Sequence, residues 1–246
     1  MRLNYIDNID CLEGLKNVPD NSVDLFLTDP PYSSGGQFAG DRRSRTAVKY
    51  TGRYGNISDL EDFSGDNMDQ RGFTEFCRQI FAKCREKTKP EGVIVTFIDW
   101  RNLPAMTDAI QAAGWTWRGI AVWHKPNGRP SKGRFRSEFE YIVWGSNGPM
   151  PFDRGVGCLS GYYRANNVHS KDRVHQTEKP LQLIMDLLEI VPQGSTVCDP
   201  FMGSGTTAVA CLKTGRNYIG FELSKGYHAI AQQRIAETID ELMNEE

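Results

Sequence analysis

The chain alternates short apolar runs with longer amphipathic stretches, and this alternation constrains its fold more than any other feature. The apolar runs predict β-strands over residues 23–28, 92–98, 119–123, 140–144 and 218–221. The amphipathic stretches predict helices over residues 73–86, 103–113, 180–191, 206–213 and 227–243. Strands that alternate with helices form mostly parallel sheets with helices on both faces. We therefore expect an α/β, Rossmann-like fold with a mixed, mostly parallel sheet.

Two segments interrupt the alternation, residues 33–72 and residues 146–176. Both are rich in glycine and polar residues, and neither reads as a linker between two cores. Loops of this length inside a domain are usually functional. With 246 residues, 39% of them hydrophobic, the chain is long enough to bury one core. We expect a single domain over residues 1–246, with loop insertions at these two segments.

Composition limits where the protein works and which chemistry it uses. No apolar run approaches the roughly 18 residues of a membrane span, and the first residues lack the layout of a signal peptide. The six cysteines form no CxxC pair, and neither they nor the four histidines have the spacing of a metal site. We therefore expect a cytoplasmic protein with no membrane segment and no metal ion.

A glycine-rich turn follows a short apolar strand at residues 197–199. Gly203 and Gly205 allow positive φ and close approach of a ligand, and the helix that follows offers free N–H groups. Glu222 ends the next strand, where a carboxylate can accept hydrogen bonds from both hydroxyls of a ribose. The spacing G-x-G-x-x-A, completed by Ala208, is also the fingerprint of dinucleotide-binding enzymes. The turn alone therefore leaves an NAD(P)-dependent oxidoreductase open.

The strand over residues 23–28 ends in Asp29-Pro30-Pro31-Tyr32. The two prolines fix φ and remove two N–H donors, so the turn is stiff. Asp29 and the Pro30 carbonyl form a pair of acceptors for an exocyclic amino group, and Tyr32 offers an aromatic face on which a base can stack. At the carboxyl end of a parallel strand, such a turn faces the usual ligand crevice. Asp29, Pro30 and Tyr32 are therefore the candidate catalytic residues.

Together, the segments Asp29-Pro30-Pro31-Tyr32 and Asp199-Pro200-Phe201-x-Gly203-x-Gly205-Thr206 resemble the amino-group DNA methyltransferases that use S-adenosylmethionine. Their order along the chain resembles the β class, a circular permutation of the common arrangement. Residues 8–11 resemble the segment of that family that contacts the adenine of the cofactor. Residues 138–144 and 175–180 resemble two further stretches of the family, the second with a lysine near the methionine carboxylate.

The resemblance implies the class I methyltransferase fold, with permuted motif order and S-adenosylmethionine as cofactor. It implies that the cofactor is bound by Asp10, Cys11, Asp29, Lys179, Asp199, Phe201, Gly203, Ser204, Gly205, Thr206 and Glu222. The target base must be flipped out of its duplex. In the family, the Asp-Pro-Pro-Tyr form goes mostly with adenine, so we expect transfer to adenine N6, with cytosine N4 as the alternative. Methylation of RNA or protein, and DNA binding without activity, are less favoured.

The net charge of −2 gives little sign of a nucleic-acid partner, but the distribution of charge does. Cations gather in two runs, interleaved with aromatic residues, as in segments that contact phosphates and bases. The cations expected to bind double-stranded DNA are Arg42, Arg43, Arg45, Lys49, Arg129, Lys132, Arg134 and Arg136. A homodimer, common in the β class, and a cognate endonuclease of a restriction-modification system are the other partners to test.

Overall fold

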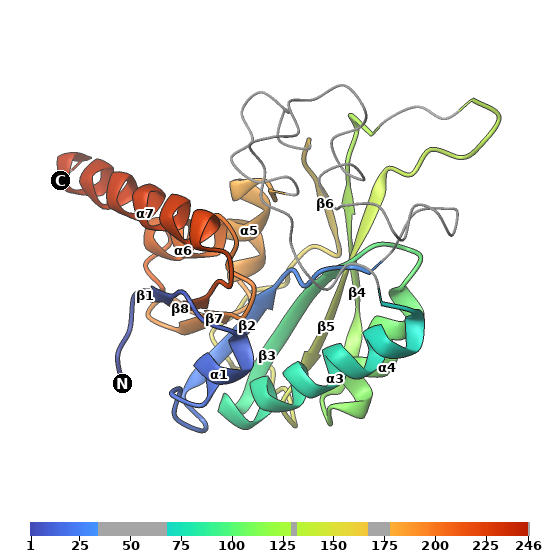
Figure 1. Ribbon diagram of the computed structural model, residues 1–246, viewed down its shortest axis with the longest axis horizontal. Helices are drawn as coiled ribbons and strands as arrows, with labels where there is room; N and C mark the ends of the chain where they lie inside the picture. The colour runs from blue at the N-terminus through green and yellow to red at the C-terminus, as the bar shows by residue number, and fades with distance from the viewer. Residues whose placement is uncertain (34–67, 129–131, 167–177, 246) are drawn as a thin grey trace.

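The computed structural model describes residues 1–33, 68–128, 132–166 and 178–245. Its centre is an eight-stranded sheet in the order β1-β8-β7-β2-β3-β5-β4-β6 (Figure 1). The strands are β1 (Tyr5–Asp7), β2 (Val23–Thr28), β3 (Thr88–Ile98), β4 (Thr116–His124), β5 (Phe139–Ser146), β6 (Tyr162–Arg164), β7 (Thr196–Asp199) and β8 (Asn217–Phe221). β5 runs antiparallel to β3 and β4, and the other neighbours are parallel. The expected mixed, mostly parallel sheet is confirmed.

Helices cover both faces of this sheet (Figure 1). One face carries α1 (Cys11–Leu15), α3 (Gln70–Lys87) and α4 (Leu103–Ala112). The other face carries α5 (Leu181–Leu188), α6 (Thr206–Lys213) and α7 (Lys225–Glu245). Each face therefore has its own layer of helices, as the alternation of segments predicts.

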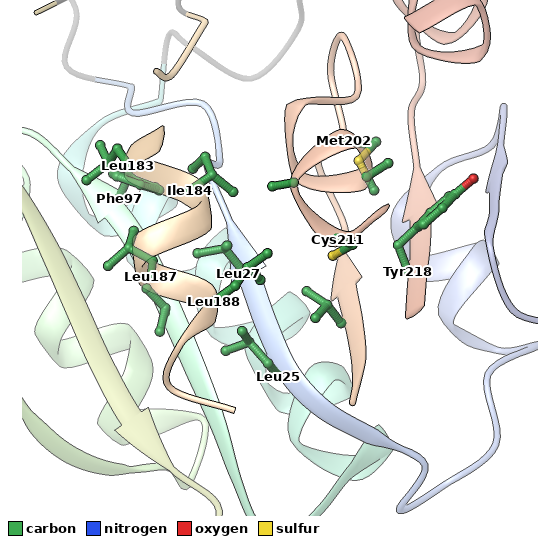
Figure 2. Packing of buried hydrophobic residues seen from close by; sticks show 14 of the residues in the cluster. Leu25, Leu27, Phe97, Leu183, Ile184, Leu187, Leu188, Met202, Cys211 and Tyr218 are labelled. Atoms are coloured by element: carbon green, nitrogen blue, oxygen red, sulfur yellow. The ribbon is translucent and has the colours of Figure 1, made fainter. Parts of the chain in front are cut away.

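The buried core is divided between the two faces because successive side chains of a strand point to opposite sides. In β2, Leu25 and Leu27 belong to the cluster on the α5 side, whereas Phe26 belongs to the cluster on the α1 and α3 side. Figure 2 shows Leu25 and Leu27 beside Leu187 and Leu188 of α5. Leu25, Phe26 and Leu27 are apolar in succession because this part of the strand is covered on both faces.

The predicted strands and helices are present, with differences at their ends. β3 begins at Thr88 and β4 at Thr116, earlier than their apolar runs indicate, whereas α6 has the predicted bounds. The sequence pattern does not predict β1, α1 or β6, which have three, five and three residues. Elements this short are missed because periodicity is recognised only over a longer window.

The two predicted loop insertions are shorter than their composition suggests. α3 begins inside the first, because the side chain of Asp69 caps it by accepting a hydrogen bond of 2.7 Å from the Gly72 N–H. The second insertion starts within β5 and contains β6, which pairs with the edge of β4. Residues 34–67 of the first insertion and residues 167–176 of the second lie outside the described residues.

Candidate active site

β7 and β2 are neighbours in the sheet, and the chain leaves their carboxyl ends toward opposite faces. β7 leads into α6 on one face, whereas α3, the next described helix after β2, lies on the other. Parallel sheets bind ligands at such a switch point. A cavity of about 650 Å³ opens there, lined by the turns after both strands and by residues of α3, β4, β5 and β8.

This cavity brings together residues that are far apart in the sequence. Its lining includes the three candidate catalytic residues, Asp29, Pro30 and Tyr32. It also includes every candidate cofactor-binding residue except Gly205. Asp10 and Glu222, which lie near opposite ends of the chain, meet here because β1 pairs with β8.

The turn after β7 is fixed by hydrogen bonds within the chain. Gly203 has a φ of 55°, and its N–H donates to Glu222 Oε2 over 2.8 Å. Glu222 Oε1 accepts a second bond, also of 2.8 Å, from the N–H of Ser224. The carboxylate of Glu222 is therefore held in a defined place at the end of β8, in the cavity wall.

Gly205 contributes to helix packing. It caps the amino end of α6 with a φ of 86°. A Cβ atom at this position would lie 3.0 Å from the Cβ of Ala231 in α7. Both the backbone conformation and the lack of space therefore require glycine, so that α6 can approach α7.

Asp199, at the end of β7, is only 4% exposed, and both of its carboxylate oxygens have partners. Oδ1 accepts a hydrogen bond of 3.0 Å from the Phe201 N–H, and Oδ2 accepts one of 2.7 Å from the Thr207 hydroxyl. Burial outweighs these bonds and raises the pKa of Asp199 to about 7. Near neutral pH the group therefore exists in both its neutral and its charged form.

Asp10 and Cys11 form the wall of the cavity at the start of α1. Asp10 caps this helix, because its Oδ1 accepts a hydrogen bond of 2.9 Å from the Leu12 N–H. Cys11 is buried, and burial raises the pKa of its thiol to about 12. A neutral thiol is a poor nucleophile, so Cys11 is suited to contact a ligand rather than to attack it.

Asp29 occupies the other side of the cavity. Its Oδ2 forms a close ion pair with the Lys179 ammonium group. Its Oδ1 is buried and has no hydrogen-bond partner among the described residues. Burial raises the pKa of Asp29, although Lys179 acts against it. Asn102, which lies between β3 and α4, also holds this turn in place. Its side-chain amide donates a hydrogen bond of 2.7 Å to the Tyr32 carbonyl.

The sequence analysis missed Glu140 and Lys125, which complete the polar wall beside Asp29. Glu140 Oε1 accepts a hydrogen bond of 2.7 Å from Lys125 Nζ, and Oε2 accepts one of 2.9 Å from the Tyr32 hydroxyl. Lys179 Nζ lies 3.7 Å from Glu140 Oε2. The available signal was a carboxylate within an otherwise apolar strand, because a charge buried there needs a partner.

The β4–β5 loop begins at this wall and carries further cations. Lys132, Arg134 and Arg136 are exposed, and Figure 1 shows the loop extending beyond the end of the sheet. Lys125, at the start of the loop, lines the cavity, and its N–H donates to the Glu138 carbonyl over 2.7 Å. The other candidate DNA-binding cations, Arg42, Arg43, Arg45, Lys49 and Arg129, lie outside the described residues.

The described part of the chain contains neither a helix suited to cross a membrane nor a group of side chains suited to hold a metal ion. None of its helices is long and apolar enough to cross a membrane. Within the same residues, no group of three or more histidine, cysteine, aspartate or glutamate side chains is arranged to hold a metal ion.

Known proteins resemble this chain in both sequence and fold. A protein-family model described as DNA methylase, of the N6/N4 methyltransferase type, matches residues 23–155 and 158–233. YubD of Escherichia coli (strain K12), a methylase by name, is 31% identical over 229 residues, which span 92% of this chain and 88% of YubD.

Two solved structures resemble the fold described above. M1.HpyAVI in complex with SAM has a TM-score of 0.67 at 23% identity, covering 94% of this chain and 98% of that one. The PvuII DNA methyltransferase, described as cytosine-N4-specific, has a TM-score of 0.71 at 18% identity, covering 98% and 93%. At these identities the likeness concerns the fold, whereas the family match extends over most of the chain. The chain therefore belongs to the DNA methylase family, the N6-adenine and N4-cytosine methyltransferases whose methyl donor is S-adenosylmethionine.

Proposed function

We propose that this protein transfers a methyl group from S-adenosylmethionine to N6 of an adenine that is flipped out of double-stranded DNA. The observation that carries the proposal is the Asp29 carboxylate, whose buried Oδ1 has no partner among the described residues. It lies in the cavity together with Pro30 and Tyr32. An aspartate at the start of this turn favours adenine, and cytosine N4 remains the alternative.

The residues of the cavity suit the cofactor. A volume of about 650 Å³ is in the range of small-molecule sites. We assign Asp10, Cys11 and Phe201 to the adenine ring. Asp10 and Cys11 line the cavity at the start of α1, and Phe201 adds an apolar face. Glu222 is suited to the ribose hydroxyls. Lys179, Asp199, Gly203, Ser204 and Thr206 are assigned to the amino-acid end of the cofactor and the backbone around it, whereas Asp29 is assigned to the target base and Gly205 does not line the cavity.

In the reaction, the bound cofactor supplies an electrophilic methyl group on a sulfonium. Asp29 Oδ1 and the Pro30 carbonyl accept the two N–H bonds of the target amino group, which favours a pyramidal, nucleophilic nitrogen as positive charge develops. Transfer would form the C–N bond as the C–S bond of the donor breaks, and the target nitrogen held by Asp29 and Pro30 would lose one proton. Tyr32 stacks on the flipped base and holds its nitrogen in line with the methyl group.

Other readings of the sequence have less support. The oxidoreductase alternative rested on the glycine spacing, and the family match now assigns that spacing to a DNA methylase. Contact of both basic runs with DNA, a homodimer and a cognate endonuclease stay predictions. The most informative experiment is therefore one that identifies the methylated base.

The target base can be read directly from the product. Purified protein is incubated with plasmid DNA and S-adenosylmethionine labelled in the methyl group, and the DNA is digested to nucleosides for mass spectrometry. Labelled N6-methyladenine is the expected product. Labelled N4-methylcytosine would assign the alternative base, and no labelled nucleoside would contradict the proposed activity.

Asp29→Ala is expected to lower kcat by at least about 10³-fold, because it removes an acceptor that acts where charge develops. The Kd for S-adenosylmethionine, measured by calorimetry, should change much less, since most assigned cofactor contacts come from other residues. The matched control is Asp108→Ala, a change at an exposed aspartate of α4 outside the cavity. Wild-type turnover by the Asp29 variant would contradict the mechanism.

A further inference from the structure

Two partly buried carboxylates face the same lysine in the half of the cavity assigned to catalysis. Asp29 comes from the turn after β2 and Glu140 from β5, with 25% and 15% of their side chains exposed. Lys179, 8% exposed, pairs with Asp29 and lies 3.7 Å from Glu140 Oε2. The ring centroid of Tyr32 lies 5.3 Å from the same ammonium nitrogen. The proposed mechanism uses Asp29 and leaves Glu140 without a role.

The oxygens of the two carboxylates are occupied differently. Glu140 has a donor from this chain on each oxygen, Lys125 at 2.7 Å and the Tyr32 hydroxyl at 2.9 Å. Asp29 has Lys179 on one oxygen and no described partner on the other. Asp29 can therefore accept a hydrogen bond from a substrate, whereas Glu140 is already engaged by the protein. Two acids in one site with such different surroundings are expected to have different roles.

The pKa values of Asp29 and Glu140 are also shifted in opposite directions. Burial acts on both acids, but Lys179 and Lys125 outweigh it at Glu140 and lower the pKa of that group. At Asp29 burial prevails, and the negative charge of Glu140 adds to it, so the pKa of Asp29 is raised. The charged and titratable side chains that line the cavity with Asp29 are Asp10, Cys11, Tyr32, Asp99, Arg101, Lys125, Glu140, Glu178, Lys179, Asp199, Glu222 and Tyr227.

We propose that Glu140 is a positioning residue for the methyl transfer: it orients Tyr32, restrains Lys125 and Lys179, and controls through its charge the ionisation of Asp29. This inference rests on the proposed function, because it assumes that Asp29 and Tyr32 receive the target base. Glu140 reaches them because β5 pairs antiparallel with β3, with Tyr141 opposite Ile98. The residue before Tyr141 therefore lies at the carboxyl end of β3, beside the turn that carries Asp29.

The first test needs no catalysis. The side-chain carboxyl carbons of aspartate are labelled with ¹³C, and the Asp29 signal, assigned by its loss in Asp29→Asn, is titrated by NMR in the cofactor-free protein. Glu140→Gln should move the pKa of Asp29 to lower pH, because a neighbouring negative charge has been removed. Glu138→Gln is the matched control, since Glu138 pairs with Arg136 and His124 and does not line the cavity. An Asp29 titration unchanged in Glu140→Gln would overturn the electrostatic part of the proposal.

The second test is kinetic. Glu140→Gln should lower kcat about 10- to 100-fold, which is the usual cost of misplaced reacting groups, and change the KM for DNA less. The acid limb of its kcat/KM profile should move to lower pH with Asp29. Glu140→Asp keeps the charge, so its acid limb should return toward that of the wild type. Its kcat should stay low, because the shorter side chain cannot reach both Tyr32 and Lys125.

The outcomes separate this inference from the proposed function. If the wild type and Glu138→Gln methylate DNA, and Glu140→Gln and Glu140→Asp have the same kcat as the wild type, only the positioning role is wrong. If the wild type does not methylate DNA, the proposed function fails, and the NMR titration still decides whether Glu140 controls Asp29. Should Glu140→Gln not fold, wild-type kcat in Glu140→Asp would by itself overturn the positioning role.

Discussion

At the residue scale, Asp199 shows how burial sets the chemistry of the cavity. Its carboxyl group has a pKa of about 7 in the folded protein, against an ordinary value of 3.8. Between these two pH values the folded protein binds a proton that the unfolded chain has released. The contribution of Asp199 to the free energy of unfolding therefore falls as pH rises from about 4 to about 7, and it is constant above that range.

Asp199→Asn should remove this pH dependence, because the amide does not titrate. Relative to the wild type, the free energy of unfolding of the variant should rise by roughly 4 kcal/mol between pH 4 and pH 8, for a displacement of about three pKa units. Denaturant unfolding at a series of pH values measures this difference. Asp108→Asn, at an exposed aspartate, should show a constant difference from the wild type. A constant difference for Asp199→Asn as well would show that the acid is not buried as described.

At the scale of elements, the contact between α6 and α7 depends on one glycine. Gly205 begins α6 in the left-handed region, and its missing side chain leaves room for Ala231 of α7. Arg234 of α7 reinforces the same contact, because its guanidinium donates to the Ser204 carbonyl over 2.9 Å. The turn between β7 and α6, which borders the part of the cavity that we assign to the cofactor, is thus held in place by α7.

Gly205→Ala should destabilise the protein by about 2–4 kcal/mol, since it adds both left-handed strain and a close contact with Ala231. Gly194→Ala is the matched control, because its φ is 80° and no atom of the described residues beyond its chain neighbours lies within 4 Å of the added Cβ. That variant should lose only the strain, about 1–2 kcal/mol. Thermal or denaturant unfolding of both variants gives the two values. Equal losses would mean that α7 does not press on Gly205.

At the scale of the whole molecule, charge is separated although the sum is only −2. The β4–β5 loop extends beyond the carboxyl end of β4 (Figure 1). Its cations Lys132, Arg134 and Arg136 are exposed, and the cavity lies at the same end of the sheet. Acidic residues gather instead toward the end of α7, at Glu237, Asp240 and Glu241. DNA is attracted to the local potential rather than to the net charge. We therefore expect modest DNA affinity that depends strongly on salt.

Replacing Lys132, Arg134 and Arg136 together with alanine should weaken DNA binding for all sequences. The slope of log K against log salt should become shallower by up to about 3, because each phosphate contact contributes about one unit. The control replaces Lys16, Lys83 and Lys213, which pair with glutamates on helices and do not line the cavity. Titration of labelled DNA at several salt concentrations measures both. An unchanged slope in the first variant would remove this loop from the DNA interface.

The same comparison of salt slopes extends to the other predicted contacts. Replacing Arg42, Arg43 and Arg45, which lie outside the described residues, is expected to weaken DNA binding in the same general way.

The sequence by itself determined the fold class and pointed to the turn that we propose is catalytic. Apolar period is a local property, so β2, α6 and the order of strands and helices follow from it directly. The chemistry of Asp29 to Tyr32 is also local, because four consecutive residues carry the acceptors, the stiffness and the aromatic face. Short elements such as β6 were not predicted, because their few residues show no period. β6 forms by pairing with β4.

Only the tertiary structure decided which distant side chains joined that turn. Glu140 and Lys179 are more than 100 residues from Asp29 in the chain. Glu140 comes near it because β5 pairs with β3, and Lys179 because it precedes α5, which packs on the sheet; no local pattern encodes either contact. The structure likewise decided the charge of Asp199, through burial, and the need for glycine at position 205, through α7. Residue type and local spacing specify a chemical capacity, whereas burial and long-range contacts, which depend on the whole fold, set its pKa and its partners.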